Sequence, residues 1–414
     1  MKGSSVGRYT FHYHLRSMVL EGALNGVWQL NEIVARKSLG AGTWWVTLIV
    51  MAPSAALLLS VLWGPHLEGR KKAPWFLVAG VVGRLVLLAA AWATSPWLFT
   101  LILAVSALSY SILYPAQNAL YQSNYAPGER GRLFGLAYSG YGLTSMGVAV
   151  AAGWCYDRWP DSFRAVYPAA GVLGFGACWY FYRMRERWVF RPPGEGTRNP
   201  FVLAWRILRA DRGFAFFQGA FFCYGIGFMI MATLLPLYLV DALRVTYSQA
   251  SVMRVLLFQG MLSLFTWVMG RYSDRFHPLS LARWSFLGLV LFPALLFASA
   301  GPRGGYLTFL WYGLCMAGVT VAWYMGPLVF AGARDSSLYM TVHVALTGVR
   351  ALIGHPLGAA LYVFSGSFAL PFAVAALFFA AGFALTFPAG ENVRGAGGCR
   401  PRSPVAESAS GGPP

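Results

Sequence analysis

Twelve apolar stretches of the chain are each long enough to cross a lipid bilayer as a helix. The hydrocarbon core of a bilayer is about 30 Å thick, so a helix needs roughly 20 residues to span it. Of the 414 residues, 57% are hydrophobic and only 11% are charged. Soluble domains usually carry about 25% charged residues, so this composition predicts an all-α membrane protein. The stretches lie near residues 17–35, 42–63, 73–93, 96–121, 132–155, 164–183, 213–240, 249–270, 279–299, 305–328, 338–362 and 367–388.

The longest polar connection, 184–212, divides these twelve stretches into two sets of six. It contains Arg-Pro-Pro-Gly-Glu-Gly at Arg191–Gly196, a run that cannot cross a membrane. Apolar residues recur on one side of Asn199–Leu208, which predicts a short helix on the membrane surface. The tail after Gly390 is rich in Gly, Ser and Pro, which predicts disorder. We therefore expect a six-helix bundle at 1–183, a linker at 184–212, a second six-helix bundle at 213–390 and a disordered tail at 391–414.

The distribution of basic residues between the connections predicts the orientation. Cytoplasmic connections of membrane proteins carry an excess of Lys and Arg. With both termini in the cytoplasm, the cytoplasmic segments hold 23 Lys and Arg and the opposite side holds 6. This difference supports an even number of spans. It also explains the net charge of +18 better than a nucleic-acid partner does, because binding to nucleic acid requires a basic face on a folded surface.

The first stretch carries a stripe of polar side chains, which is unusual for a helix in lipid. In Leu20–Ala35, the residues Glu21, Asn25, Gln29 and Glu32 fall within about 80° of a continuous helix. A carboxylate near the bilayer centre costs roughly 2.5–3.5 kcal/mol, so such residues normally face a protein interior or a wet cavity. A soluble or interfacial amphipathic helix is the alternative. The apolar stretches that follow favour a helix that lines a passage.

Two connections repeat one pattern at corresponding places in the two sets of helices. Each has a carboxylate four residues after a Gly, followed by basic residues, on the predicted cytoplasmic side. The residues are Gly64, Glu68 and Arg70 in the first set and Gly270, Asp274 and Arg275 in the second. Gly and charge are common at cytoplasmic turns, which is the alternative explanation. The match of helix order, side and spacing favours an internal repeat, a feature of many transporters.

With these paired loops, the chain resembles the major facilitator superfamily of secondary transporters over roughly residues 10–390. The resemblance implies two six-helix bundles and loops that control switching between outward-open and inward-open states. The sequence departs from the family pattern because Glu68 replaces the usual Asp and the basic residues after it are displaced. The proton-antiporter signatures of the family are absent as well. These departures argue against drug–proton antiport and leave other proton coupling open.

The resemblance also implies that the first, fourth, seventh and tenth helices line a central cavity. Polar and aromatic residues recur on these helices at helical spacing. Membrane-interface anchoring is the alternative for the tyrosines of the fourth helix, and ordinary packing is the alternative for the others. The candidates are Tyr110, Tyr114, Gln117 and Tyr121 in the fourth helix, Gln218 and Tyr224 in the seventh, and Tyr312 and Trp323 in the tenth.

Three arginines, Arg84, Arg254 and Arg350, fall within predicted spans and each needs a carboxylate, a carbonyl or water as a partner. Glu21 and Glu32 are the deep carboxylates, so we expect Arg–Glu pairs, although the sequence does not say which. Arg254 is near a helix end, where snorkelling to the interface is equally compatible. His343, two turns before Arg350, titrates in a range that suits proton transfer, and a buried neutral histidine is the alternative.

Together these features predict a transporter that moves a small solute by alternating access, with Glu21 as the candidate for a proton- or ion-coupling group. We expect a monomer in a cell membrane, with the bacterial inner membrane as its location. No metal site or cofactor motif is expected, because the five cysteines and six histidines are scattered and no phosphate loop is present. A non-transporting membrane scaffold on the same fold and a polytopic membrane enzyme are the two alternatives.

Overall fold

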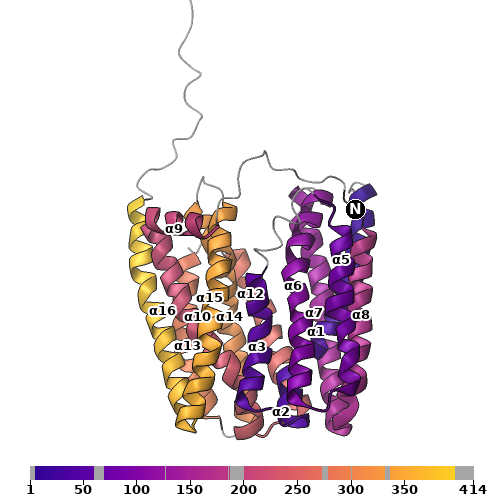
Figure 1. Cartoon of the computed structure of the whole chain (residues 1–414). Helices are drawn as coiled ribbons and strands as arrows, with labels where there is room; N and C mark the ends of the chain where they lie inside the picture. The colour runs from indigo at the N-terminus through magenta and orange to yellow at the C-terminus, as the bar shows by residue number, and fades with distance from the viewer. Residues whose placement is uncertain are drawn as a thin grey trace, which may run out of the picture.

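The computed structural model describes residues 5–59, 70–125, 127–184, 186, 200–272, 278–299, 301–331 and 336–396. Within these residues the chain is helical and contains no strand, which confirms the all-α prediction for this part of the protein. The helices run roughly parallel to one axis and form one long bundle (Figure 1).

The helices of the first half follow the predicted stretches closely, with one break. Their bounds are α1 Ser5–Trp28, α2 Asn31–Ser38, α3 Thr43–Leu58, α5 Ala73–Ala79, η1 Gly80–Arg84, η2 Leu85–Trp92, α6 Pro96–Asn124, α7 Pro127–Arg158, η3 Pro160–Ser162 and α8 Phe163–Arg183. The second half follows the prediction equally well. Its bounds are α9 Pro200–Ala210, α10 Arg212–Leu237, η4 Tyr238–Ala242, α11 Tyr247–Ser251, η5 Val252–Leu257, α12 Phe258–Tyr272, α13 Pro278–Phe297, α14 Pro302–Ala331, α15 Ser336–Ser365 and α16 Ala369–Ala396. The helix predicted in the linker is present as α9.

The first predicted span is not one continuous helix, which corrects the assumption of a single polar stripe. Helix α1 ends at Trp28 and the chain turns at Gln29 and Leu30 before α2 begins. Glu32 therefore lies on a separate helix from Glu21, in the first turn of α2. There its negative charge is favourable to the positive end of the helix dipole. The break explains why these two carboxylates meet different partners.

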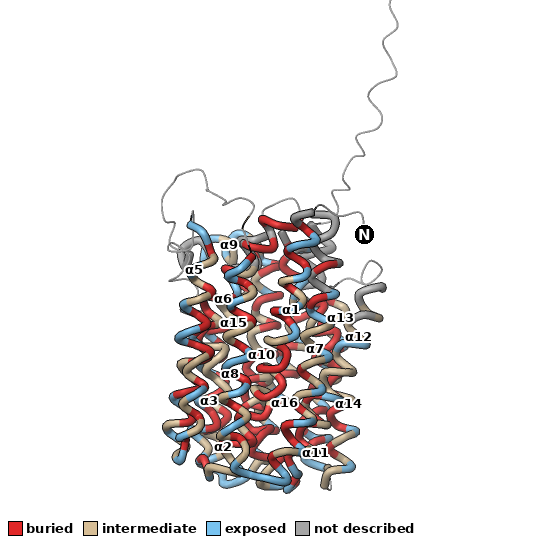
Figure 2. The backbone as a smooth tube through the Cα atoms, turned by 90° about the vertical axis from the view of Figure 1, so that its right-hand side faces the viewer, coloured by how far each residue is buried: buried red, intermediate tan, exposed pale blue. Residues whose placement is uncertain are grey.

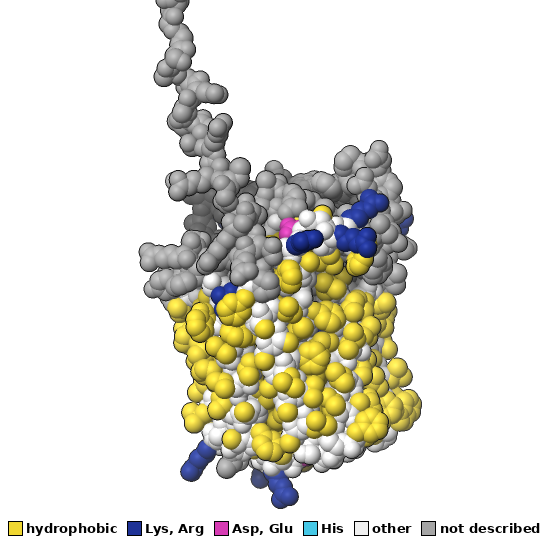
Figure 3. Space-filling model, turned by 90° about the vertical axis from the view of Figure 1, so that its left-hand side faces the viewer, with side chains coloured by type: hydrophobic (Ala, Val, Ile, Leu, Met, Phe, Trp, Pro, Cys, Tyr) yellow, Lys and Arg dark blue, Asp and Glu magenta, His cyan; other side chains and the backbone are white. Residues whose placement is uncertain are grey.

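Seven segments of the described chain are long and apolar enough to cross a membrane: Ala73–Trp92, Pro96–Tyr114, Arg212–Ala242, Leu279–Phe297, Pro302–Pro327, Val342–Ser365 and Ala369–Phe387. Thr43–Leu58 is a shorter apolar helix. The face of the bundle in Figure 3 is a belt of hydrophobic side chains with basic residues at its two ends. Such an apolar surface is that of a multi-pass membrane protein, because soluble proteins rarely expose large contiguous apolar patches.

The two halves of the chain lie side by side (Figure 1). In the first half, α1 packs against α7 and α8, and in the second half α10 packs against α15 and α16. Helix α10 is buried along most of its length, which makes it the central helix of its half (Figure 2). The N-terminus and the end of α16 lie at the same end of the bundle, and α2 lies at the other end.

Candidate functional site

An ion pair inside the first half joins Glu21 of α1 to Arg84 at the end of η1. Arg84 Nη2 donates a hydrogen bond of 2.5 Å to Glu21 Oε1, and the arginine side chain is 0% exposed. The Arg84 guanidinium also lies 4.4 Å from the ring centroid of Tyr110 in α6. The structure thus shows that Glu21 is the carboxylate that pairs with Arg84. Three groups that are costly to bury in lipid stabilise one another here.

Glycines and a π-helical turn create the space that Arg84 occupies. A Cβ atom on Gly174 of α8 would lie 3.1 Å from Arg84 Cδ, and one on Gly83 would lie 2.1 Å from Ser109 Cβ of α6. The helices can approach at these points only because no side chain intervenes. The wider turn at Gly80–Arg84 changes the direction in which the last residue points.

Tyrosines continue from this ion pair toward the second half. Tyr110 stacks on Tyr114 with ring centroids 5.5 Å apart, and Tyr138 stacks on Tyr141 of the same helix at 5.0 Å. Tyr138 of α7 and Tyr324 of α14 belong to opposite halves. Tyr114, Tyr138 and Tyr324 are 49%, 50% and 54% exposed. Their partial exposure makes them candidates for lining a passage between the halves.

A second polar cluster lies inside the other half, between α10 and α15. Gln218 Oε1 and His343 Nδ1 are 2.9 Å apart, and the ring of Trp323 lies 5.0 Å from that of His343. Arg350 donates from Nη1 to the carbonyl oxygen of Phe221 at 2.6 Å. Four predicted residues from three helices, Gln218, Trp323, His343 and Arg350, are thus brought together.

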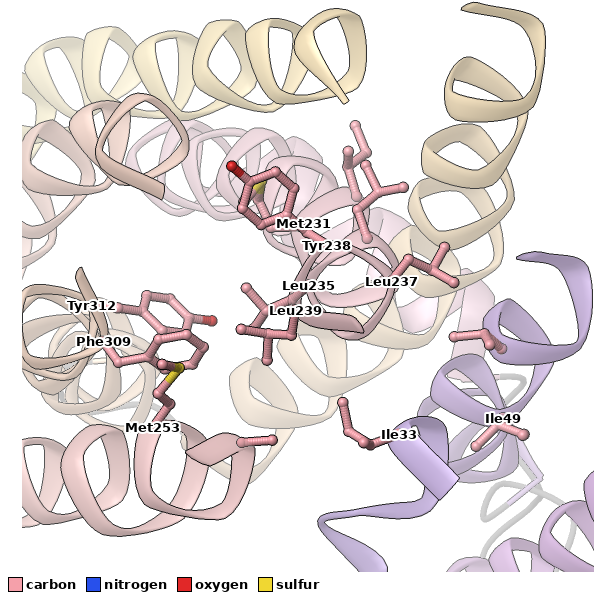
Figure 4. Close-up of a cluster of buried hydrophobic side chains, with 14 of the residues drawn as sticks. Ile33, Ile49, Met231, Leu235, Leu237, Tyr238, Leu239, Met253, Phe309 and Tyr312 are labelled. Carbon is pink, nitrogen blue, oxygen red and sulfur yellow. The ribbon is translucent and has the colours of Figure 1, made fainter. Parts of the chain in front are cut away.

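Other predicted residues lie in tight packing, and one of them, Tyr224, has its ring centroid 6.0 Å from the Arg350 guanidinium. Tyr121 packs against His14 at the end of the bundle near the termini, with ring centroids 4.4 Å apart. Tyr224 stacks on Phe286 at 4.8 Å inside the second half. Tyr312 stacks between Phe258 and Phe292 (Figure 4 shows its position).

The remaining polar residues of the first span have different surroundings. Asn25 Nδ2 donates to Ser145 Oγ of α7 at 2.8 Å, so it joins two helices of one half. Gln29 lies half-buried at the break after α1, and Gln117 is half-buried on α6. Glu32 accepts a hydrogen bond of 2.9 Å from Arg254 Nη1 in η5, and this pair connects the two halves.

The predicted loop residues fall largely outside the described chain. Gly64, Glu68, Asp274 and Arg275 lie outside the described residues. Arg70 is exposed just before α5, and Gly270 lies in α12. Within the described residues, no group of three His, Cys, Asp or Glu side chains is arranged to hold a metal ion.

Contacts between the halves gather at the end of the bundle opposite the termini. Ile33 of α2 and Ile49 of α3 belong to one buried apolar cluster with residues of the second half, among them Leu235, Leu239 and Met253 (Figure 4). We call the part of this cluster made by Ile33, Ile49, Leu235, Leu239 and Met253 the apolar plug. It removes apolar surface of both halves from water and thereby favours their association at this end.

Polar contacts that sequence reasoning missed surround the apolar plug. Arg36 donates two hydrogen bonds to Asp241, at 3.0 and 2.7 Å, in a bidentate pair. Lys37 Nζ donates to the carbonyl oxygen of Val245 at 2.9 Å. Asp157 at the end of α7 accepts from the backbone N–H of Tyr247 at 2.7 Å, at the start of α11. A signal was available, because Arg36 and Lys37 are basic residues on the side that the positive-inside rule leaves poor in charge.

The Arg36 guanidinium remains protonated over the physiological pH range. The pKa of Arg36 is raised, because the hydrogen bonds to Asp241 outweigh the opposing effect of burial. Burial lowers the pKa of Lys37, and the nearby charge of Asp157 partly offsets that effect. The contact of Arg36 with Asp241 is therefore broken when the two halves separate and not by titration of Arg36.

Each π-helical turn in the described chain carries a residue of an ion pair. Arg84 ends η1, Asp241 lies in η4 and Arg254 lies in η5. These residues pair with Glu21, Arg36 and Glu32, respectively. A π-helical turn inserts an extra residue into the helix and re-aims its side chains, and such turns are frequent at functional sites. This feature follows from packing and was not predicted from hydropathy.

Comparison with known proteins gives one family and a set of similar structures. The sequence profile of the Major Facilitator Superfamily matches residues 34–337, which is most of the chain. No curated protein sequence matches this chain. A mutant of the nucleoside transporter NupG superposes with a TM-score of 0.73 at 13% identity, over 92% of this chain and 99% of that one.

Two further solved structures are similar over almost their whole length. A bacterial homologue of the human lysosomal transporter Spinster, in an inward-facing and unoccupied conformation, has a TM-score of 0.69 at 14% identity and covers 95% of this chain and 98% of its own. A mutant of the peptide transporter POT in complex with sulfate has a TM-score of 0.70 at 14% identity, over 93% and 95% of the two chains. At these identities the likeness is one of fold.

Proposed function

Because the chain belongs to the Major Facilitator Superfamily, we propose that it is a secondary transporter that moves a small solute across the membrane by alternating access. One observation carries this proposal. The two halves associate through the apolar plug at one end, while Tyr114, Tyr138 and Tyr324, which come from both halves, remain half-exposed. Rocking of the halves about a site between them would expose it to each side of the membrane in turn.

The topology belongs to the same proposal. We propose twelve spans in two six-helix domains, 1–183 and 213–390, joined by the linker 184–212, with both termini cytoplasmic in a bacterial inner membrane. The shared end of the two termini and the excess of basic residues on that side support this orientation. We propose that the end closed by the apolar plug is the outer one and that this conformation is inward-facing.

Glu21 is the proposed site of proton coupling. It is a deep carboxylate that contacts a buried arginine, so its charge state depends on its surroundings in each conformation. A proton on Glu21 would release Arg84 from its counter-ion. The energetic link between protonation and the arrangement of α1, η1 and α6 would couple a pH gradient to solute movement.

The function is tested by reconstituting the protein into liposomes and measuring uptake of radiolabelled nucleosides, peptides, sugars and carboxylates, with and without a pH gradient. We expect at least one solute to enter faster than in protein-free liposomes and to accumulate when a proton gradient is applied. If no solute enters and the protein purifies with a stoichiometric protein partner, the scaffold alternative replaces the transporter.

Weakening the polar rim of the apolar plug is expected to shift the conformational equilibrium modestly. Arg36→Ala removes a bidentate pair whose two side chains are each 25% exposed. Partly exposed pairs contribute about 1 kcal/mol at most, which corresponds to roughly a 5-fold change in population. The measurement is the rate at which a membrane-impermeant thiol reagent modifies Ile33→Cys in a cysteine-free background. The control is Arg164→Ala, whose pair with Asp161 lies within one half, and an equal change there would contradict the assignment.

A further inference from the structure

One arginine in the interior of the protein has no counter-ion among the described residues. Arg84 pairs with Glu21 and Arg254 pairs with Glu32, whereas Arg350 makes no ion pair in the described chain. It lies halfway along α15 and is 5% exposed. A guanidinium group does not lose its proton in a protein. The interior of the second half therefore holds a full positive charge that no described side chain neutralises.

The surroundings of Arg350 hold its guanidinium in place with neutral groups. Nη1 donates to the carbonyl oxygen of Phe221 and Nη2 donates to Thr347 Oγ1 at 3.1 Å. Nε is buried and has no acceptor among the described residues. A Cβ atom on Gly225 would lie 2.1 Å from Arg350 Cδ, so only glycine leaves room for the side chain at that point. The positive charge of Arg350 is thus held in a fixed position without a negative charge beside it. Such an arrangement is costly in a medium of low polarity.

Further unused hydrogen-bonding groups lie in the same cluster. Gln218 Nε2 and His343 Nε2 are both buried and lack a partner among the described residues. Nδ1 of His343 donates to Gln218 Oε1, so Nε2 of the neutral ring is an acceptor. Trp323, whose ring lies against His343, is half-buried, and Tyr324 next to it is exposed. The cluster combines the N–H groups of Arg350 and Gln218 with the aromatic surface of Trp323.

We propose that Arg350 binds the negatively charged group of the transported solute, and that the substrate is a small organic anion. This inference rests on the proposed function and specifies its substrate class. A carboxylate or phosphate would accept hydrogen bonds from Arg350 and Gln218, and the planar guanidinium suits both groups. The organic part of the solute would contact Trp323 and the tyrosines. Glu21 and Arg84 neutralise each other. The charge of Arg350 therefore stays available to bind the solute.

The test uses pairs of compounds that differ in charge. Phenylacetate is compared with phenylacetamide, succinate with succinamide, and phenyl phosphate with phenol, in thermal-shift titrations of the purified protein in detergent. We expect at least one anion to raise the melting temperature, with an apparent Kd at least 10-fold lower than that of its neutral partner. Three anions that all bind no better than their neutral partners would overturn the proposal.

Variants of Arg350 connect the binding to this residue. Arg350→Gln is expected to weaken binding of the anion at least 10-fold, and Arg350→Lys to restore part of the loss. Arg283→Gln is the matched control, because Arg283 also donates to a threonine hydroxyl and a backbone carbonyl, at Thr386. Unchanged affinity in Arg350→Gln, or an equal loss in Arg283→Gln, would contradict the proposal.

Two further measurements separate binding from folding. Arg350→Met removes an uncompensated charge, so the ligand-free variant is expected to melt no lower than the wild type. Gly225→Ala keeps the charge and displaces the guanidinium, so it is expected to weaken anion binding as well. A lower melting temperature for ligand-free Arg350→Met would show a structural role instead. Uptake of a neutral solute that is unaffected by Arg350→Gln would refute the anion class and leave transport itself intact.

Discussion

Replacing Glu21 with glutamine is expected to lower the free energy of unfolding by about 3–5 kcal/mol, because it leaves the charge of Arg84 buried without a partner. The Arg84 side chain is 0% exposed and its Nη2 contacts Glu21 directly. Arg84→Met should cost a similar amount, since it leaves the carboxylate unpaired. The double variant Glu21→Gln, Arg84→Met removes both charges and is expected to recover most of the loss. Denaturation of the purified proteins in detergent measures the free energy of unfolding of the three variants and the coupling energy between residues 21 and 84.

The control for this cycle is the exposed pair of Arg164 and Asp161, which are separated by 3.6 Å. Arg164→Met is expected to change the stability by less than about 0.5 kcal/mol, as surface substitutions usually do. If Glu21→Gln is as stable as the wild type, the carboxyl group is already neutral in the folded protein and the ion pair is wrongly assigned.

The same double variant makes the proposed role of Glu21 in coupling measurable. Because its fold is expected to be intact, it separates loss of coupling from loss of structure. We expect it to exchange solute down a concentration gradient and to fail to accumulate solute in response to a pH gradient. Undiminished accumulation would exclude Glu21 as the coupling group.

A single larger side chain at Gly153 is expected to prevent closure of the end of the bundle that holds the apolar plug. This residue of α7 approaches α11 of the other half, and a Cβ atom on it would lie 2.2 Å from Ser251 Oγ and 2.9 Å from the carbonyl oxygen of Tyr247. Gly153→Leu would force the two helices apart. Because each cycle of alternating access requires closure at this end, uptake is expected to fall at least 10-fold. Each half retains its own buried helices, so the variant is expected to remain folded.

Other glycines of α7 provide matched controls. At Gly142 and Gly147 a Cβ atom would meet nothing within 4 Å. Gly142→Leu and Gly147→Leu are therefore expected to transport at nearly the wild-type rate. In Gly153→Leu, labelling of Ile33→Cys in the apolar plug should rise to the rate of an accessible thiol. Full uptake by Gly153→Leu would mean that the α7–α11 contact is not part of the transport cycle.

The glycines of the fifth and eleventh predicted helices show what a local sequence pattern can predict and what it cannot. In a membrane bundle, small residues at helical spacing indicate places where two helices approach closely. Gly153 and Gly348 confirm this, since Cβ atoms there would meet Ser251 and Leu58 of the opposite half. Gly354 and Gly358 instead face Met229 and Ile230 of α10 in their own half. The composition indicated that helices approach each other closely at these glycines. Only the packing of the helices decided which helix each glycine contacts.

The sequence by itself determined the helical stretches, the division into two halves and the residues that are costly to bury, because hydropathy and helical spacing are local properties. It identified Glu21, Glu32 and the three arginines within predicted spans without assigning their partners. Tertiary structure decided those assignments, as Glu21 meets Arg84 within one half and Glu32 meets Arg254 across the two. It also placed the break after Trp28 and the π-helical turns that aim the charges. An ion pair depends on where two helices pack in space, and no property of either helix alone fixes that position.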